Sequence, residues 1–285
     1  MIKAQIAGVN LHMQPGNETF FERRLREYFK ESEVPDITVT GEVCDVIPFP
    51  QGRETLRLRR SVVTAGEDGL IHRTVIDEET GAPLMDIGFG AQYAFSHIKV
   101  LRSRQSPLTP TDYEYMYSGE MFNNRLAVLG GFVLHSSSIV YKGRGVAFSA
   151  NSGTGKSTHT GLWKDMLGDE VRYINDDKPA VRIVGGIHTL FGTPWSGKTD
   201  INSNIWVPLH AVVFIERGEE NKIRRLGVTD SMYQLVTQVS RPYYDRDIGI
   251  RVLDAAQRLV TELPIYLLTC NISQNAVETV LNELF

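Results

Sequence analysis

Apolar and polar residues alternate along most of the first hundred positions, a pattern typical of strands that bury one face. We predict strands over residues 3–11, 38–44, 55–63 and 71–76, and a hairpin turn over 78–81 that leads to a strand at 83–85. One helix interrupts these strands, because Asn17 is a capping residue and the bulky residues after it share one helical face: Phe20, Phe21, Leu25, Tyr28 and Phe29. The N-terminal part of the chain is therefore predicted to be β-rich.

From residue 112 onwards, predicted helices and strands alternate. Helices are predicted over residues 112–127, 156–167, 231–239, 252–263 and 274–284, and strands over 138–140, 145–148, 169–174, 180–184, 187–191, 209–215 and 265–270. Strands outnumber helices and several follow one another directly, so we expect an α/β (α+β) fold with a mixed β-sheet rather than a purely parallel one. The run 106–111, rich in proline, serine and threonine, is typical of a linker and divides the chain into parts 1–105 and 106–285.

The most informative stretch lies between the predicted strand 145–148 and the helix that follows it. Strand, glycine-bearing turn, Gly-Lys-Ser and helix is the arrangement of a phosphate-binding loop. Gly153 and Gly155 allow the backbone to curl with its N–H groups pointing inward, where the helix N-terminus adds further donors. Lys156 can place its ammonium on the outer phosphates, and Ser157 can ligate Mg²⁺. The residues predicted to contact a nucleotide are Asn151, Ser152, Gly153, Thr154, Gly155, Lys156, Ser157 and Thr158.

A simpler interpretation of this stretch is a glycine turn with a lysine at a helix start, which needs no ligand. Ala150 favours it, because the full phosphate-loop pattern has glycine at that position. An alanine costs little where φ is negative, however. The strand before the turn and the helix after it favour the phosphate-binding interpretation.

A pair of acidic residues, Asp176 and Asp177, follows the strand that comes after the loop helix. One carboxylate at such a strand end can hold Mg²⁺, and the other can accept a proton from an attacking hydroxyl. The alternative is an ordinary surface turn. Further on, the polar loop 192–199 contains Lys198, which either neutralises transferred phosphate charge or is a solvated loop lysine.

Composition narrows the classes of function. The chain has 285 residues and a net charge of −4, which argues against a nucleic-acid-binding protein. Its two cysteines, Cys44 and Cys270, lie far apart and form neither a disulfide framework nor a metal-ligand cluster. The first residues begin no signal peptide, and no apolar run reaches the roughly 18 residues of a membrane span. We therefore expect a cytoplasmic protein without membrane partners.

The second half of the chain resembles the HPr kinase family and, more distantly, the ATP-dependent phosphoenolpyruvate carboxykinases. The resemblance rests on the run 152–157, on residues 175–177 with their paired aspartates, and on His135, which stands before the loop where HPr kinases have a histidine. It implies a nucleotide-binding domain over residues 106–285, with the phosphate loop in the middle of a mixed sheet. The β-rich region 1–105 resembles no family, and its role is left open.

The resemblance also implies a role for each matching residue. ATP phosphates would lie on residues 153–157, and Mg²⁺ would be bound by Ser157 and Asp177. Asp176 would be the general base, and His135 would lie near the transferred phosphate. HPr kinases form rings, so a homo-oligomer is expected by analogy.

We therefore expect a Mg²⁺- and ATP-dependent kinase that phosphorylates a hydroxyl group, such as a serine, on a peptide, protein or small molecule that the sequence does not identify. One alternative is a catalytically silent ATP-binding switch, which is favoured by Ala150 and by Thr158, where HPr kinases carry an acidic residue. Another is a carboxykinase-like enzyme, although carboxykinases are much longer. The glycine-rich signature that follows the aspartates of HPr kinases is missing from this sequence, which argues against HPr as the acceptor.

Overall fold

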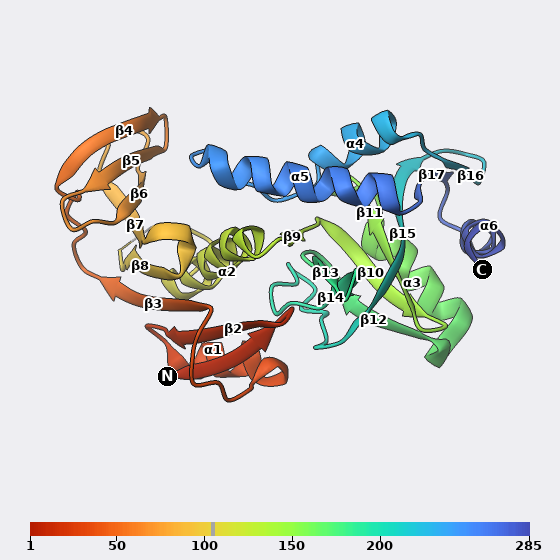
Figure 1. Cartoon of the computed structure of the whole chain (residues 1–285), viewed down its shortest axis with the longest axis horizontal. Helices are drawn as coiled ribbons and strands as arrows, with labels where there is room; N and C mark the ends of the chain where they lie inside the picture. The colour runs from red at the N-terminus through yellow and green to blue at the C-terminus, as the bar shows by residue number, and fades with distance from the viewer. Residues whose placement is uncertain (104–105) are drawn as a thin grey trace. The chain divides into compact units, whose positions relative to one another are not determined.

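A computed structural model describes residues 1–103 and 106–285 (Figure 1). The chain forms two compact units. Unit 1 comprises Met1–Leu129 and Pro242–Arg246, and unit 2 comprises Gly130–Arg241 and Asp247–Phe285. The sequence boundary at 105/106 falls beside residues 104–105, which lie outside the described residues, and the helix over 110–128 belongs to unit 1 by its contacts. No helix in the described part of the chain is both long and apolar enough to cross a bilayer.

Unit 1 is built on one mixed sheet with the strand order β1-β2-β3-β8-β7-β6-β5-β4. The pairs β2·β3 and β3·β8 are parallel and the others antiparallel, and α2 packs against β3 and β8. The elements are β1 (Ile2–Ile6), β2 (Val9–Gln14), α1 (Glu18–Leu25), η1 (Arg26–Tyr28), β3 (Ile37–Cys44), β4 (Gly52–Leu58), β5 (Ser61–Gly66), β6 (Ile71–Ile76), β7 (Pro83–Phe89), η2 (Ala91–Tyr93), β8 (Phe95–Leu101) and α2 (Pro110–Val128).

Two predicted strands of unit 1 are in fact hairpins. The stretch 3–11 turns at Ala7 and Gly8, which both have positive φ, so β1 and β2 pair with each other. The stretch 55–63 turns at residues 59–60 between β4 and β5. Neither turn carries the Asn-Gly or Asp-Gly signal of a tight hairpin. The alternation of apolar and polar residues continues across both turns, so the pattern predicted one strand in place of two. The helix cap was predicted correctly: the Asn17 side chain accepts a hydrogen bond from the Phe20 N–H.

Unit 2 is built on a second mixed sheet, with the order β12-β10-β11-β15-β14-β13-β9 and with β17 pairing β15 and β16. This confirms the expectation of an α+β fold with a mixed sheet. The elements are β9 (Phe132–Val133), β10 (Ser136–Tyr141), β11 (Arg144–Ser149), α3 (Lys156–Leu167), η3 (Gly168–Glu170), β12 (Val171–Asn175), β13 (Ala180–Val184), β14 (Ile187–Phe191), β15 (Trp206–Arg217), β16 (Lys222–Arg225), α4 (Val228–Val236), α5 (Arg246–Glu262), β17 (Ile265–Cys270) and α6 (Gln274–Leu284).

The strand that precedes the glycine-bearing loop lies inside this sheet. β11 pairs antiparallel with β10 through a tight hairpin at Lys142 and Gly143, which both have positive φ, and parallel with β15. β15 in turn pairs parallel with β17. The carboxyl ends of β11, β15 and β17 therefore meet at one edge of the sheet, which is where open α/β sheets bind ligands.

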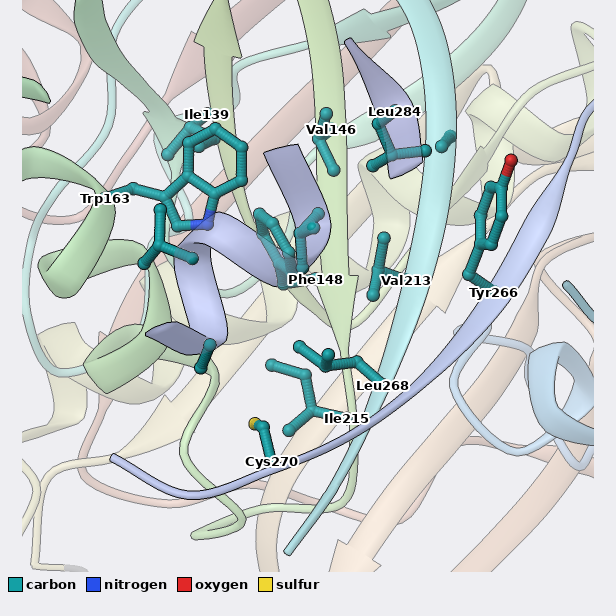
Figure 2. Close-up of a cluster of buried hydrophobic side chains, with 14 of the residues drawn as sticks. Ile139, Val146, Phe148, Trp163, Val213, Ile215, Tyr266, Leu268, Cys270 and Leu284 are labelled. Carbon is teal, nitrogen blue, oxygen red and sulfur yellow. The ribbon is translucent and has the colours of Figure 1, made fainter. Parts of the chain in front are cut away.

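A hydrophobic core fixes the loop helix on this sheet (Figure 2). Trp163 of α3 is fully buried and packs against Phe148 of β11, and alternate residues of β15 and β17, such as Val213 and Leu268, complete the cluster. The neighbouring positions Ala147 and Val212 are buried as well, so both faces of the strands are covered. Because α3 is held against β11, the turn between them has little freedom to move.

Candidate active site

The turn between β11 and α3, residues 150–155, is shaped by two glycines. Gly153 has φ +76° and Gly155 has φ +126°, conformations that residues with a side chain rarely adopt. A Cβ at either position would meet no atom within 4 Å, so backbone conformation rather than crowding calls for glycine. α3 begins at Lys156, as predicted, and points its unpaired N-terminal N–H groups at this turn.

Lys156 is folded back into the turn. Only 8% of its surface is exposed, and its Nζ donates to the carbonyl oxygens of Ala150 at 2.9 Å and Asn151 at 3.5 Å. Burial lowers the pKa of this ammonium, while the charges of Asp177 and Asp176 act in the opposite direction. Ser157 and Thr158, in the first turn of the helix, are exposed. The loop thus places the Lys156 ammonium within electrostatic range of both aspartates and leaves the Ser157 hydroxyl exposed.

Asn175 fixes the conformation of the two aspartates that follow it. Its side chain is fully buried; Oδ1 accepts from the N–H groups of Asp177 at 2.8 Å and Lys178 at 2.6 Å, and Nδ2 donates to the Thr193 carbonyl at 2.7 Å. These bonds hold the turn after β12 in one shape and attach it to the loop 192–199. The acidic pair therefore lies in a turn held by hydrogen bonds, in which Asp176 is buried and Asp177 is partly exposed.

Asp176 is held by one hydrogen bond and leaves one oxygen unpaired. Only 6% of the residue is exposed, and Oδ1 accepts from the Ser137 hydroxyl at 2.5 Å. Oδ2 is buried and has no hydrogen-bond partner among the described residues. A buried carboxylate oxygen without a partner is costly, and in active sites it is commonly used to take a proton or bind a cation.

Asp177 faces His135 and Lys178. His135 Nε2 lies 3.4 Å from Asp177 Oδ1, and Lys178 Nζ lies 3.6 Å from Oδ2. Burial and the Lys156 ammonium lower the pKa of His135, so its ring is neutral at neutral pH. Its Nδ1 lies 3.0 Å from Gln238 Oε1 and donates to it, which leaves Nε2 as a second acceptor beside the carboxylate. Two acceptors at this distance need a proton or a cation between them.

Gln238, which follows α4, connects this histidine with the loop. Besides accepting from His135, it donates from Nε2 to the Asn151 side chain at 3.0 Å, and its backbone carbonyl accepts from the His135 N–H at 2.8 Å. The sequence analysis did not identify Gln238, because a glutamine near a helix end carries no signal of its own. Its role appears only once the fold brings His135, just before β10, and the loop 150–155 beside it.

Arg217 is a second residue that the sequence analysis missed. It lies at the carboxyl end of β15, and its guanidinium donates to the carbonyls of Gly153 at 2.5 Å and Thr154 at 3.2 Å. The two carbonyl groups therefore point towards the positively charged guanidinium. The N–H groups of the loop that have no partner remain available for an anion. One feature of the sequence could have pointed to Arg217: it is an arginine just after an apolar run that was predicted to be a buried strand.

Lys198 is exposed, and within the described part of the chain its ammonium forms no ion pair or hydrogen bond. Its loop does reach the site: Gly197, with φ +69°, packs so closely on Asp177 that a Cβ there would lie 3.0 Å from the aspartate Cβ. Lys178, and not Lys198, forms the ion pair with Asp177. The role predicted for Lys198 stays a prediction.

The donors at this site suit Mg²⁺ held jointly by protein and phosphate. Among the described residues, no group of three or more His, Cys, Asp or Glu side chains could hold a metal ion by itself. Mg²⁺ usually takes one or two carboxylates, water and substrate phosphates rather than an all-protein cage. The unpaired Asp176 Oδ2, the Asp177 carboxylate and the Ser157 hydroxyl are oxygen donors of that kind.

Comparison with known proteins assigns the chain to a family. The profile of the family described as "ScmC: SynChlorMet cassette protein ScmC" matches residues 116–284, which is more than half of the chain. The chain belongs to the ScmC family. The match includes α3, the aspartate turn and Gln238, so the whole candidate site lies in the part that defines this family.

Two further comparisons were made for this ScmC family member. No curated protein matches it. Among solved structures, the HPr(Ser) kinase/phosphatase of Coxiella burnetii is similar, with a TM-score of 0.32 and 12% sequence identity over 53% of this chain and 88% of that chain.

Proposed function

We propose that unit 2 binds Mg²⁺·ATP and transfers the γ-phosphoryl group to a hydroxyl group, such as a serine, on a peptide, protein or small molecule. One arrangement carries this proposal. A glycine-bearing loop follows β11, and the buried Lys156 folds back onto it. At the same site, Asp176 has a buried carboxylate oxygen without a hydrogen-bond partner among the described residues. Phosphoryl transfer needs little more than a phosphate cradle and a group that positions the nucleophile.

Each residue of the candidate site would have a role in phosphoryl transfer that follows from the chemistry of its side chain. The loop N–H groups and the Lys156 ammonium would bind the phosphates, in place of the Ala150 and Asn151 carbonyls that the ammonium now contacts. Asp176 would accept the proton of the acceptor hydroxyl. At the same time the hydroxyl oxygen would bond to the γ-phosphorus, and the bond between the γ-phosphorus and ADP would break. Mg²⁺, held by Ser157 and Asp177, would neutralise negative charge on the phosphates. His135 Nε2, 3.4 Å from Asp177 Oδ1, would share a proton or the cation with that carboxylate.

Binding and transfer can be tested separately. Calorimetry with Mg²⁺·ATP should give a binding heat that Lys156→Ala abolishes, whereas Lys164→Ala, a partly exposed lysine of the same helix, should bind like the parent. With γ-labelled ATP and a library of serine-bearing peptides, Asp176→Asn should bind ATP but transfer no label. Asp169→Asn, at an exposed acidic residue, is the matched control. Absence of ATP binding by the parent protein would refute the proposal.

A second candidate function, an ATP-dependent switch without transfer, is favoured by one observation. Gln238 holds Asn151 of the loop, and soon after it the chain enters the segment Pro242–Arg246, which belongs to unit 1 by its contacts. A loop that rearranges on binding ATP would pull on this connection. Hydrogen exchange over residues 237–246 with and without Mg²⁺·ATP tests this. A change in exchange without label transfer to any acceptor supports the switch, and label transfer excludes a purely silent module.

A further inference from the structure

A cavity of about 390 Å³ lies beside the phosphate loop, at the carboxyl ends of β15 and β17. Its walls come from Gly155 of the loop, Leu162 of α3, Ile215 of β15, Cys270 of β17 and Ile272 beyond it. Ile215 and Cys270 also belong to the core cluster, where Figure 2 shows them at one end. Pockets that hold small ligands measure roughly 300–1,000 Å³, so this cavity can take a molecule of modest size.

The sheet topology sets this cavity on the flank of the loop opposite the aspartates. β11, which leads into the loop, lies between β10 and β15. The acidic turn follows β12, on the far side of β10, whereas the cavity opens where β15 and β17 end. A nucleotide whose last phosphate pointed to Asp176 would therefore extend its other end across the loop towards the cavity.

The walls of the cavity suit a flat, largely apolar ring with hydrogen-bonding edges. Leu162, Ile215 and Ile272 supply aliphatic surface, and Ile272 is 79% exposed, unusually so for an isoleucine. A large aliphatic side chain left in water beside a cavity is explained if a ligand covers it.

One buried donor in the cavity wall lacks a partner. His159 is 3% exposed, and its Nε2 accepts from the Trp163 indole N–H at 3.1 Å. Burial lowers the pKa of His159 to about 4, so the ring is neutral and carries its hydrogen on Nδ1. Nδ1 has no hydrogen-bond acceptor among the residues that the structure describes. This N–H is itself buried, so a ligand in the cavity reaches it only where the side chains of the wall move.

We propose that this cavity binds the nucleoside half, a purine base with its ribose, of the nucleotide whose phosphates occupy residues 150–157. The inference rests on the proposed function, since it extends the same ligand beyond its phosphates. It makes a distinct claim: the loop recognises the phosphates, and the cavity between α3, β15 and β17 distinguishes a nucleotide from a bare phosphate chain.

The test compares two probes, Mg²⁺·ATP and inorganic tripolyphosphate with Mg²⁺, by calorimetry on the full chain. Ile272→Ala removes apolar contact from an exposed position, so folding is preserved. It should weaken ATP binding by about tenfold and leave tripolyphosphate binding unchanged. Leu162→Phe, which fills the cavity from the other wall, should act the same way. Ile187→Ala, at an exposed isoleucine outside the cavity lining, should change neither affinity.

The outcomes separate this inference from the proposed function. If neither probe binds the parent protein, or Lys156→Ala leaves both affinities intact, the proposed function fails and the cavity proposal fails with it. If both probes bind through Lys156 but Ile272→Ala and Leu162→Phe leave the ratio of the two affinities unchanged, the phosphate site stands and the cavity proposal is overturned.

Discussion

The side-chain amide of Gln238 donates a hydrogen bond of 3.0 Å to the side chain of Asn151, in the glycine-bearing loop between β11 and α3. The same glutamine accepts from His135, so one residue holds the loop and the histidine in a fixed relation. Because Gln238 is 7% exposed, its own amide has little access to water if either bond is lost, so breaking one is costly.

Replacing Gln238 with leucine should weaken Mg²⁺·ATP binding by about fivefold to tenfold, the equivalent of one lost hydrogen bond in loop preorganisation. Gln234→Leu, near the end of α4, is the matched control and should bind like the parent. Calorimetric affinities measure both. Equal affinities for parent and Gln238→Leu would show that ATP binding does not depend on the hydrogen bond between Gln238 and Asn151.

The neighbouring serines of β10 offer a comparison between a charged and a neutral hydrogen bond. Ser137 donates to the Asp176 carboxylate, and Ser138 donates to the Asn175 carbonyl at 2.9 Å; both are fully buried. Ser137→Ala should lower the free energy of unfolding by about 2 kcal/mol, because it leaves a buried carboxylate unpaired, and Ser138→Ala by about 1 kcal/mol. Urea unfolding of the two variants measures the difference, and equal losses would show that the hydrogen bond to Asp176 is no stronger than one to a backbone carbonyl.

Two glycines separated by half a dozen residues should respond in opposite directions to alanine. Gly155 has φ +126°, so Gly155→Ala should strain the loop by about 1–3 kcal/mol and weaken ATP binding by tenfold or more. Gly161 lies within α3 with open space around its Cβ position, so Gly161→Ala should raise stability by up to about 1 kcal/mol. Thermal unfolding and calorimetry distinguish the two effects. An unaffected ATP affinity in Gly155→Ala would mean that the loop conformation does not matter for binding.

Unit 1 contains a buried acid whose ionisation should make stability depend on pH. Glu114 of α2 is 2% exposed; its Oε1 accepts from the Gly16 N–H at 2.9 Å and Oε2 has no partner among the described residues. Burial raises its pKa to about 7, while the bond from Gly16 acts the other way. The folded protein therefore retains a proton that the unfolded chain loses near pH 4.5.

The sign follows from proton binding. Below pH 4.5 Glu114 is protonated in both states; as the pH rises to about 7, folding becomes less favourable, by at most about 3 kcal/mol, and above pH 7 the loss is constant. Glu114→Gln should remove this slope from the free energy of unfolding measured between pH 4.5 and 8. Glu33→Gln, at an exposed glutamate, should keep it. A slope that persists in Glu114→Gln would trace it to other groups.

What could be predicted from the sequence was local. The strand, turn and helix around Gly155 and Lys156 were placed correctly because glycine conformation, a helix start and hydrophobic periodicity are encoded within a few neighbouring residues. The strands over 180–184 and 187–191 were likewise found with the correct bounds. Where a turn lacked a local signal, as at Ala7 and at residues 59–60, the prediction merged two strands into one.

The sequence by itself determined the strand, glycine turn and helix around Gly155, the position of the acidic turn and the periodicity of the strands of unit 2. Only the tertiary structure decided which distant residues serve that site: Gln238 meets Asn151 from 87 positions away, and Arg217 reaches Gly153 across 64. It also placed the helix over 110–128 and the segment Pro242–Arg246 in the same unit. The physical reason is that a hydrogen bond depends on distance in space, whereas a single sequence records only order along the chain.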